Sequence, residues 1–294
     1  MIFWDANRRL LKGNLHLHTT LSDGKKTPDE AMDIYRAAGY DFIAVSDHRR
    51  VTTRTREEGG LLAIQSIEYD FSLVNQVMHI VGVDVPESIE DAVDRGAGPQ
   101  RAIDEINALG GVAILAHPAW SLNTPDVMMS LRGVCAAEVY NSVSALPWNV
   151  DRADSSNVLD LCAANGHAFN LVASDDAHFY TDDVCQSWTM VAAEENSPEA
   201  IKAALRRGDF YATRGPEILR IEFDGRTVKA DTSPARAIWF ATELPWGAGR
   251  AVVGAGVTHA EYTLHPLNRR FVRVVVEDEK GRRAWSNPIV LEKI

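Results

Sequence analysis

The sequence lacks the features that would place the protein in an oxidising or membrane environment. Its three cysteines (Cys135, Cys162 and Cys185) are odd in number, widely spaced and free of any Cys-x-x-Cys pattern, which predicts reduced, packed thiols. No apolar run approaches the roughly 18 residues needed to cross a bilayer. Residues 1–9 also lack the basic-then-apolar layout of a signal peptide. We therefore expect a cytoplasmic protein without a membrane partner.

Basic charge is also scarce. The chain has 41 acidic residues against 30 Lys and Arg, a formal net charge of −11, and no Lys/Arg-rich run. This balance disfavours a stable nucleic-acid partner, because such binding depends on neutralising phosphates, although local arginines can still hold a small anion. The length of 294 residues, with 46% hydrophobic residues, suits one large domain or a large and a small one. The oligomeric state stays open.

The first part of the chain alternates between strand and helix patterns. Thr27 as N-cap, followed by Pro28 and two acidic residues, marks a helix start. The other predicted helices cover residues 99–109, 125–131, 151–164 and 197–207. The predicted strands cover residues 13–18, 41–46, 62–71, 76–83, 112–116, 134–140, 168–173 and 187–192. The pair at 62–71 and 76–83 is open to forming a hairpin. This α/β alternation predicts a parallel sheet over residues 1–216, most simply a closed barrel.

From residue 217 the pattern changes. The segments there are short and β-rich, and turn clusters such as residues 278–281 separate them. The predicted strands cover residues 219–223, 237–242, 260–264, 271–277 and 288–291. No helical pattern appears among them. We expect a small, sandwich-like all-β domain over residues 217–294.

Histidines and carboxylates recur at the predicted strand ends. His16 and His18 are two residues apart, so in a strand both project from the same face, and Asp176 and His178 repeat that spacing. Burying so many imidazoles and carboxylates without a shared cation would be costly. The sequence therefore predicts a multinuclear metal site built from the following residues: His16, His18, Asp23, His48, Glu68, His79, His117, Asp176 and His178.

These motifs, in this order over residues 13–178, resemble those of the PHP (polymerase and histidinol phosphatase) superfamily. The resemblance rests on the following residues: His16-Leu17-His18, Asp23, Ser46-Asp47-His48, Glu68, His79, His117-Pro118 and Asp176-Ala177-His178. It implies a distorted (β/α)7 barrel with up to three metal ions. The first ion would take His16, His18, Glu68 and Asp176. The second would take Glu68 as a bridge, with His79 and His117, and the third would take Asp23, His48 and His178.

Two positions in this scheme need comment. Asp23 stands where several relatives have a histidine, so affinity for the third ion can differ. Asp175 and Asp176 are both candidates for one ligand position, and the Asp-x-His spacing favours Asp176, with Asp175 behind it. Residues 138–141 and 211–216, together with the β-rich appendage, resemble the stand-alone CehA/McbA-type metallohydrolases.

Such a centre suits hydrolysis. Two or three divalent ions, about 3.5–4 Å apart in two-metal sites, can generate hydroxide from bound water, hold it for attack and neutralise charge on phosphoryl oxygens. The ligand set suits Zn, Mn or Fe without deciding among them. We expect cleavage of a small phosphomonoester or phosphodiester, with Glu68, His48, Asp176 and His178 at the reacting centre. Arg49 and Arg214 are candidates to hold phosphate oxygens, with Arg50 a weaker one.

Other roles and readings remain open. Asp47 is a candidate to orient His48. Trp120, Tyr140 and Trp148 can stack an aromatic ring, although packing is the simpler role. A carbamate, amide or carboxylic-ester hydrolase would use the same metal centre on a carbonyl carbon in a more apolar pocket. A non-catalytic metal-binding module is the remaining alternative.

Overall fold

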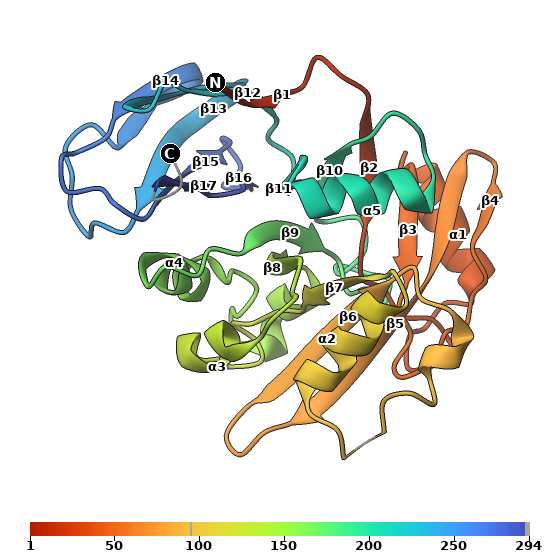
Figure 1. The fold of residues 1–294 in the computed structure, drawn as a ribbon. Helices are drawn as coiled ribbons and strands as arrows, with labels where there is room; N and C mark the ends of the chain where they lie inside the picture. The colour runs from red at the N-terminus through yellow and green to blue at the C-terminus, as the bar shows by residue number, and fades with distance from the viewer. Residues whose placement is uncertain (95, 292–294) are drawn as a thin grey trace.

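The computed structural model describes residues 1–94 and 96–291 and shows a mixed α/β protein with a large sheet and few helices (Figure 1). The helices are α1 (Pro28–Ala37), α2 (Pro99–Ala108), α3 (Pro125–Ser130), α4 (Ser156–Ala164) and α5 (Pro198–Arg207). Thr27 caps α1 as predicted, because its hydroxyl accepts from the Glu30 N–H while the Glu30 carboxylate accepts from the Thr27 N–H.

The strands that lead to the histidine motifs form one hydrogen-bonded series. Its members are β2 (Leu10–Asn14), β3 (Phe42–Val45), β5 (Leu61–Ser72), β6 (Val77–Val83), β7 (Val112–Leu115), β8 (Ala136–Asn141) and β9 (Asn170–Ser174). The neighbours β2, β3 and β5 are parallel, as are β7, β8 and β9, whereas β6 is antiparallel to both β5 and β7. The predicted hairpin of β5 and β6 is confirmed. The prediction of an all-parallel sheet is wrong at β6, because residues 73–76, which join β5 to β6, are too few for the crossover connection that parallel strands need.

The two ends of this series meet beyond the strands themselves. Leu17, after β2, bridges in parallel to Ala177, after β9. The His18 N–H donates to the Ala177 carbonyl at 3.0 Å, and the Asp176 N–H donates to the His16 carbonyl at 2.8 Å. The segment after β2 is therefore fixed beside the segment after β9, although more than 150 residues separate them by number.

Close packing inside the series depends on a glycine. A Cβ atom on Gly13 of β2 would lie 1.9 Å from the Phe42 ring of β3, so only glycine fits there. Phe42 belongs to a buried cluster of strand residues that includes Leu15, Ile64 and Val172. A second cluster lies under α2, α3 and α4, and a third lies under α1. The strands are thus held rigidly beneath the histidines.

One helix begins later than its pattern predicts. Residues 151–164 were expected to be helical, but α4 starts at Ser156. Val150 and Asp151 both have φ of 56°, in the left-handed region, which an α-helix does not accept. The Asp154 carboxylate accepts from the Ser156 N–H at 2.8 Å and so satisfies part of the helix start. The 3₁₀ turns Val143–Ala145 and Pro147–Asn149 fill the preceding loop, and Glu87–Ile89 is a third.

The C-terminal region is built from antiparallel strands. They are β12 (Ile218–Phe223), β13 (Thr227–Thr242), β14 (Ala251–Thr263), β15 (Phe271–Glu277), β16 (Arg283–Ser286) and β17 (Ile289–Val290). Two predicted strands, 237–242 and 260–264, are the ends of the longer β13 and β14. The region has its own buried cluster, which includes Trp4, Ile221, Phe240 and Val274.

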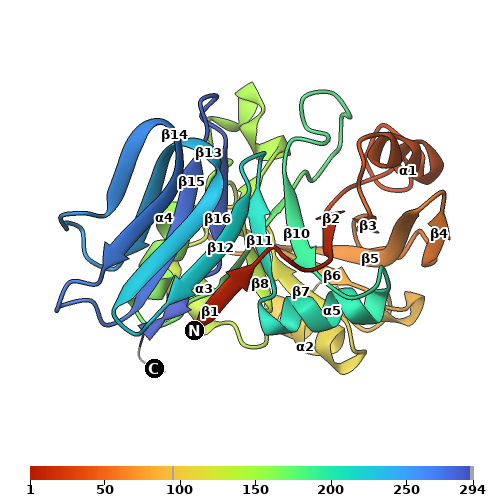
Figure 2. The ribbon, with the colours of Figure 1, turned by 90° about the horizontal axis from the view of Figure 1, so that it is seen from above.

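Strand pairings tie this region to the rest of the chain. β1 (Ile2–Asp5), from the N-terminus, pairs with β12, and Figure 2 shows the two side by side. β10 (Trp188–Ala192) pairs with both β2 and β11 (Phe210–Thr213), and β11 pairs with β16. The predicted boundary at residue 216 stays a prediction, and β1 adds an N-terminal strand to the C-terminal sheet. β4 (Arg56–Glu58) is a short strand on the outer side of β5.

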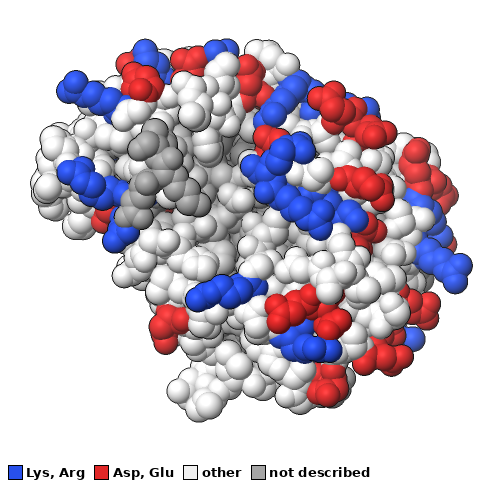
Figure 3. Space-filling view, viewed as in Figure 1, with Lys and Arg blue, Asp and Glu red and all other residues white. Residues whose placement is uncertain are grey.

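The surface agrees with the mixed charge of the sequence. Figure 3 shows acidic and basic side chains interspersed over this face, with no large area of one sign. Within the described residues, no helix combines the length and the apolar character that crossing a membrane would require.

Candidate metal centre

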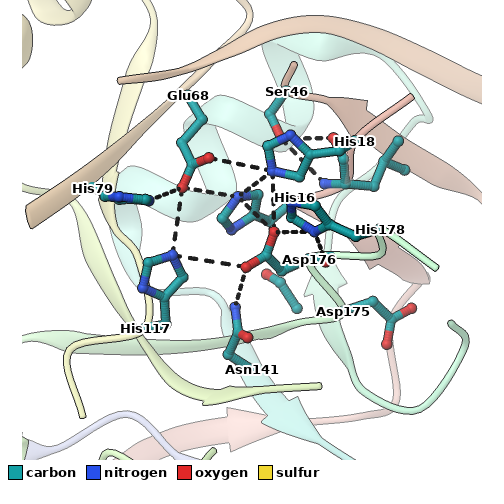
Figure 4. A network of polar contacts seen from close by, with 12 residues as sticks. His16, His18, Ser46, Glu68, His79, His117, Asn141, Asp175, Asp176 and His178 are labelled. Atoms are coloured by element: carbon teal, nitrogen blue, oxygen red, sulfur yellow. Dashed lines mark hydrogen bonds and ion pairs between the residues drawn. The ribbon is translucent and has the colours of Figure 1, made fainter. Parts of the chain in front are cut away.

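The predicted metal ligands come together at one end of the strand series (Figure 4). His16 and His18 follow β2, His48 follows β3, and His117 follows β7, while Asp176 and His178 follow β9. Glu68 and His79 lie within the paired strands β5 and β6. His117 (φ 30°) and Asp176 (φ 54°) have left-handed backbones, a strain that proteins tolerate mainly at functional sites.

His16, His18 and Asp176 form one fully buried group. The Asp176 Oδ1 atom lies 3.2 Å from His16 Nε2 and 3.1 Å from His18 Nε2. The two imidazole Nε2 atoms are 3.2 Å apart. All three donor atoms therefore converge on one point, which the i,i+2 spacing of the two histidines predicted.

Glu68 lies at the centre of the cluster and is 1% exposed. Its Oε1 atom is 2.8 Å from His79 Nδ1 and 3.4 Å from His117 Nε2. Its Oε2 atom is 2.9 Å from His48 Nδ1 and 3.2 Å from His18 Nε2. One carboxylate thus faces imidazoles that come from four different segments of the chain.

The third group is more open. Asp23 Oδ1 lies 3.4 Å from His178 Nε2, and Asp23 Oδ2 lies 3.7 Å from His48 Nε2. The Asp23 side chain is 54% exposed, whereas the His18 side chain on the inner side of the group is fully buried. An ion held here would face solvent more than one held by His16 and Asp176.

The electrostatics of the cluster suit a cation. Glu68 Oε2, Asp176 Oδ1 and His48 Nδ1 are buried and make no hydrogen bond of good geometry, although buried polar atoms normally make one. The short distances between these atoms, such as 2.9 Å from Glu68 Oε2 to His48 Nδ1, are ion-pair contacts. Burial lowers the pKa of His48, but the neighbouring Glu68 carboxylate outweighs it and raises the pKa to about 9. Burial likewise lowers the pKa of His178, while Asp176 and Asp23 raise it to about 9. Without ions the cluster draws protons into positions that divalent cations would fill, so the donor set fits metal binding.

The structure distinguishes the two adjacent aspartates. Figure 4 shows Asp176 facing the histidines and Asp175 pointing away from them. The Asp175 carboxylate accepts from the Tyr35 hydroxyl at 2.9 Å, from the Ser142 hydroxyl at 2.9 Å and from the N–H groups of residues 185–187. Burial raises its pKa to about 6 despite these hydrogen bonds. Asp175 therefore holds the loop of residues 185–187 in place behind the ligand candidates.

Two residues of β8 that the ligand analysis missed support the cluster. The fully buried Glu138 carboxylate accepts from the His117 N–H at 2.8 Å through Oε2 and lies 3.0 Å from His16 Nδ1 through Oε1. The Asn141 amide donates to Glu138 at 2.8 Å and to Asp176 at 3.2 Å. These side chains orient ligands from three strands. The sequence signals for them were their place at the C-terminal end of a predicted strand and the resemblance of residues 138–141 to the CehA/McbA-type metallohydrolases.

The expectation that Asp47 orients His48 is wrong. The Asp47 carboxylate does not orient His48, because it accepts from the Thr19 N–H at 2.7 Å and from the hydroxyls of Thr19, Ser22 and Thr52. Asp47 therefore closes the loop after His18.

Arg49 turns away from the histidines. It donates to Asp70 at 2.6 Å and lies over the Tyr69 and Phe71 rings, so its guanidinium is engaged by residues of β5.

Arg214 is also placed elsewhere. Its guanidinium lies 4.3 Å above the Tyr140 ring, and Tyr140 in turn stacks on Trp285. Neither Arg49 nor Arg214 lines the cavity over the histidine cluster. The sequence could not reveal this, because each arginine lies in a loop after a strand and the direction of its side chain depends on how that loop folds.

The cluster forms the floor of a cavity of about 280 Å³. Its lining includes the ligand candidates Asp23, His48, Glu68, His79, His117, Asp176 and His178. The remaining lining residues, called the outer wall below, are Trp120, Val143, Ser144, Trp148, Asn149 and Phe179. Among the described residues, no Lys or Arg belongs to the lining.

The chain was compared with known families, proteins and solved structures. No family model matches the sequence. An uncharacterized protein of Methanocaldococcus jannaschii is 23% identical over 123 residues, which are 37% of this chain and 68% of that protein. An amidohydrolase from Chromobacterium violaceum, solved with sulfate and no metal, is 17% identical over 58% of this chain and 89% of its own, with a TM-score of 0.42.

A crystal structure from Bacteroides vulgatus matches along almost the whole length. It is a two-domain protein described as containing a predicted PHP-like metal-dependent phosphoesterase. The match covers 98% of both chains with 15% identity and a TM-score of 0.54, so it speaks to the fold, and the narrower CehA/McbA-type resemblance stays a prediction. With the histidine and carboxylate motifs at one end of its strands, the chain has a PHP-like fold.

Proposed function

We propose that the protein is a metal-dependent hydrolase, and specifically a phosphoesterase that acts on a small phosphomonoester or phosphodiester. The observation that carries this proposal is the convergence of Glu68 and Asp176 on the histidine nitrogens at 2.8–3.7 Å, with buried oxygens left unpartnered. Such a donor set does little to stabilise the fold, because no Lys or Arg of the described residues pairs with the buried Glu68 and Asp176 carboxylates. As a ligand set it matches two or three closely spaced ions.

The ligand assignment follows the sequence motifs. The first ion would take His16, His18, Glu68 and Asp176, and the second would take Glu68, His79 and His117. The third would take Asp23, His48 and His178. When bound, Zn, Mn or Fe would activate water and neutralise charge on the ester oxygens. Glu68 would fix the separation of the ions through its two oxygens, and Glu138 would hold His16 with Nε2 directed at the ion.

The finer fold assignment belongs to the same proposal. The strands from β2 to β9 would represent a distorted (β/α)7 barrel in which the β5–β6 hairpin replaces one strand–helix unit. The contact of Leu17 with Ala177, which joins the two ends of the series, supports this reading. The small all-β domain would then follow at about residue 217, completed by β1.

A second candidate function has a specific observation in its favour. The cavity lining includes no Lys or Arg among the described residues, and its outer wall is largely aromatic. Phosphate sites commonly use guanidinium groups, whereas a carbamate or carboxylic ester needs no cationic partner beyond the ions. Hydrolysis of a carbamate, amide or carboxylic ester is therefore the alternative to phosphoester cleavage.

A direct comparison of substrates tests both versions. Protein loaded with Mn or Zn is assayed on p-nitrophenyl phosphate, on bis-p-nitrophenyl phosphate and on a naphthyl carbamate, with free metal as the blank. We expect phosphoester cleavage above the blank and metal in the purified protein by elemental analysis. Cleavage of the carbamate alone would replace the phosphoesterase version with the second candidate. Metal binding without any turnover would leave only a metal-binding module.

A further inference from the structure

The outer wall of the cavity has a feature that metal chemistry does not require. Trp120, Trp148 and Phe179 come from the loops after β7, β8 and β9, three neighbouring strands, and all three line the cavity. Trp148 and Phe179 are 63% and 40% exposed. Large aromatic rings exposed together beside a cavity usually mark a binding surface.

The three rings are arranged around the ligands. Trp120 lies edge-on to His117, with ring centroids 5.0 Å apart, and to His79, at 6.0 Å. Trp148 and Phe179 meet edge-to-face with ring centroids 5.5 Å apart. Phe179 directly follows the ligand candidate His178, and Trp120 contacts the ligand candidates His79 and His117, so all three rings lie close to the cluster.

Polar groups of this wall are already engaged with one another. The Trp120 Nε1–H donates to the Asn149 side-chain oxygen at 2.9 Å, and the Asn149 amide donates to the Val143 carbonyl at 2.8 Å. The Ser144 hydroxyl donates to the Asn141 side-chain oxygen at 2.7 Å. These donors therefore already hydrogen-bond within the protein. What the wall offers a ligand is mainly ring surface, which favours flat apolar groups.

The backbone beside both exposed rings is held in unfavourable conformations. Val150 and Asp151, after Trp148, have φ of 56°, and Tyr180, after Phe179, has φ of 59°. A β-branched residue such as Val150 rarely adopts this region. Loops kept in such conformations at two sides of one cavity are typical of ligand clamps.

We propose that Trp120, Trp148 and Phe179 form an aryl-binding wall, and that the substrate is a small ester carrying a flat aromatic group beside the bond to be cleaved. This inference rests on the proposed hydrolase function and adds the class of substrate to it. The aromatic ring of the substrate packs against the Trp148–Phe179 pair and against Trp120, with the ester directed at the Glu68 cluster. Specificity arises from ring contacts, because the described lining residues include no Lys or Arg.

The test separates ring recognition from turnover. The monomethyl esters of phenylphosphonate and methylphosphonate carry the same charge and the same tetrahedral group, and only one has a ring. Isothermal titration gives the Kd of each for the Zn-loaded protein. We expect the phenyl probe to bind about tenfold more tightly than the methyl probe. In Trp148→Ala and Phe179→Ala this ratio falls to about threefold or less, as expected when one ring contact is lost.

Trp246 supplies a matched control, because it is 57% exposed and lies in the β13–β14 loop away from the cavity lining. Trp246→Ala should keep the wild-type ratio, and circular dichroism checks that every variant is folded. Equal Kd values for the two probes in the wild type, or a ratio unchanged in both wall variants, would overturn the proposal. Aryl preference without hydrolysis of any ester would instead contradict only the proposed function.

Discussion

The cluster around Glu68 and the ion-pair network around Glu277 both bury a carboxylate, but they neutralise it by different means. Glu277, in β15, is 3% exposed and accepts from Arg236 and Arg283 through separate oxygens, each at 2.8 Å. Glu68 faces only imidazoles and leaves Oε2 without a hydrogen-bond partner. The chain itself neutralises Glu277, whereas Glu68 needs either protons on its histidines or a cation.

This difference separates a structural carboxylate from a functional one more reliably than burial does. A paired charge between β13, β15 and β16 stabilises one arrangement of strands. An incompletely satisfied cluster weakens the fold locally and persists where something else binds. Each of the following experiments tests one side of that contrast.

The largest effect is expected from removing a ligand. Asp176→Ala, and equally His16→Ala, should lower ester hydrolysis by at least about 1,000-fold, which corresponds to about 4 kcal/mol of barrier. Each should also reduce the bound metal per chain, measured by elemental analysis, while the far-ultraviolet circular dichroism stays that of the wild type. Normal turnover by either variant would show that the reaction does not use this cluster.

Asp175, the neighbour of Asp176, should affect the stability of the fold and not the bound metal. Asp175→Ala leaves the Tyr35 and Ser142 hydroxyls and the N–H groups of residues 185–187 without their acceptor. We expect the free energy of unfolding to fall by about 3 kcal/mol, measured with urea on metal-free protein. Asp176→Ala should change it much less. If Asp175→Ala lost metal and kept its stability, the roles of the two aspartates would be reversed.

A smaller effect is expected from Glu138, which contacts the ligand candidates His16 and His117. Glu138→Gln keeps the size of the side chain but turns one acceptor into a donor, opposite either His16 or the His117 N–H. We expect metal affinity to fall about 10- to 100-fold, measured by competition with a chelator. Glu57→Gln, on the exposed strand β4, is the matched control and should bind as the wild type does. Equal affinities would mean that Glu138 only fills space.

The smallest effect is expected for Glu277, the buried carboxylate that two arginines neutralise. Burial raises the pKa of Glu277, but Arg283 and Arg236 outweigh it and hold the pKa below its usual range. A lowered pKa means that the ionised form stabilises the fold above the unfolded value of about 4.3 and that this contribution is lost as the pH falls further. Glu277→Gln should therefore cost up to about 1 kcal/mol at pH 7 and progressively less below pH 4. A pH-independent difference in urea unfolding would contradict this assignment.

Residue spacing was sufficient for much of the fold and of the ligand set. The α1 cap at Thr27, the β5–β6 hairpin and the approach of His16 to His18 all depend on neighbours within a few positions, so the sequence pattern predicts them. The order of the motifs also predicted that Glu68, in a strand, and Asp176, after a strand, come close together, and both reach His16. The antiparallel placement of β6 and the addition of β1 to the C-terminal sheet required the three-dimensional pairing.

The sequence by itself predicted which residues gather as candidate metal ligands, because imidazole and carboxylate at strand ends have few other uses at that density. Only the tertiary structure decided what each neighbour does. It turned Arg49 toward Asp70, placed Arg214 over Tyr140 and brought Trp148 against Phe179. The physical reason is that a ligand's chemistry belongs to the residue, whereas the direction of a long side chain depends on strand faces and loops that distant segments pack into place.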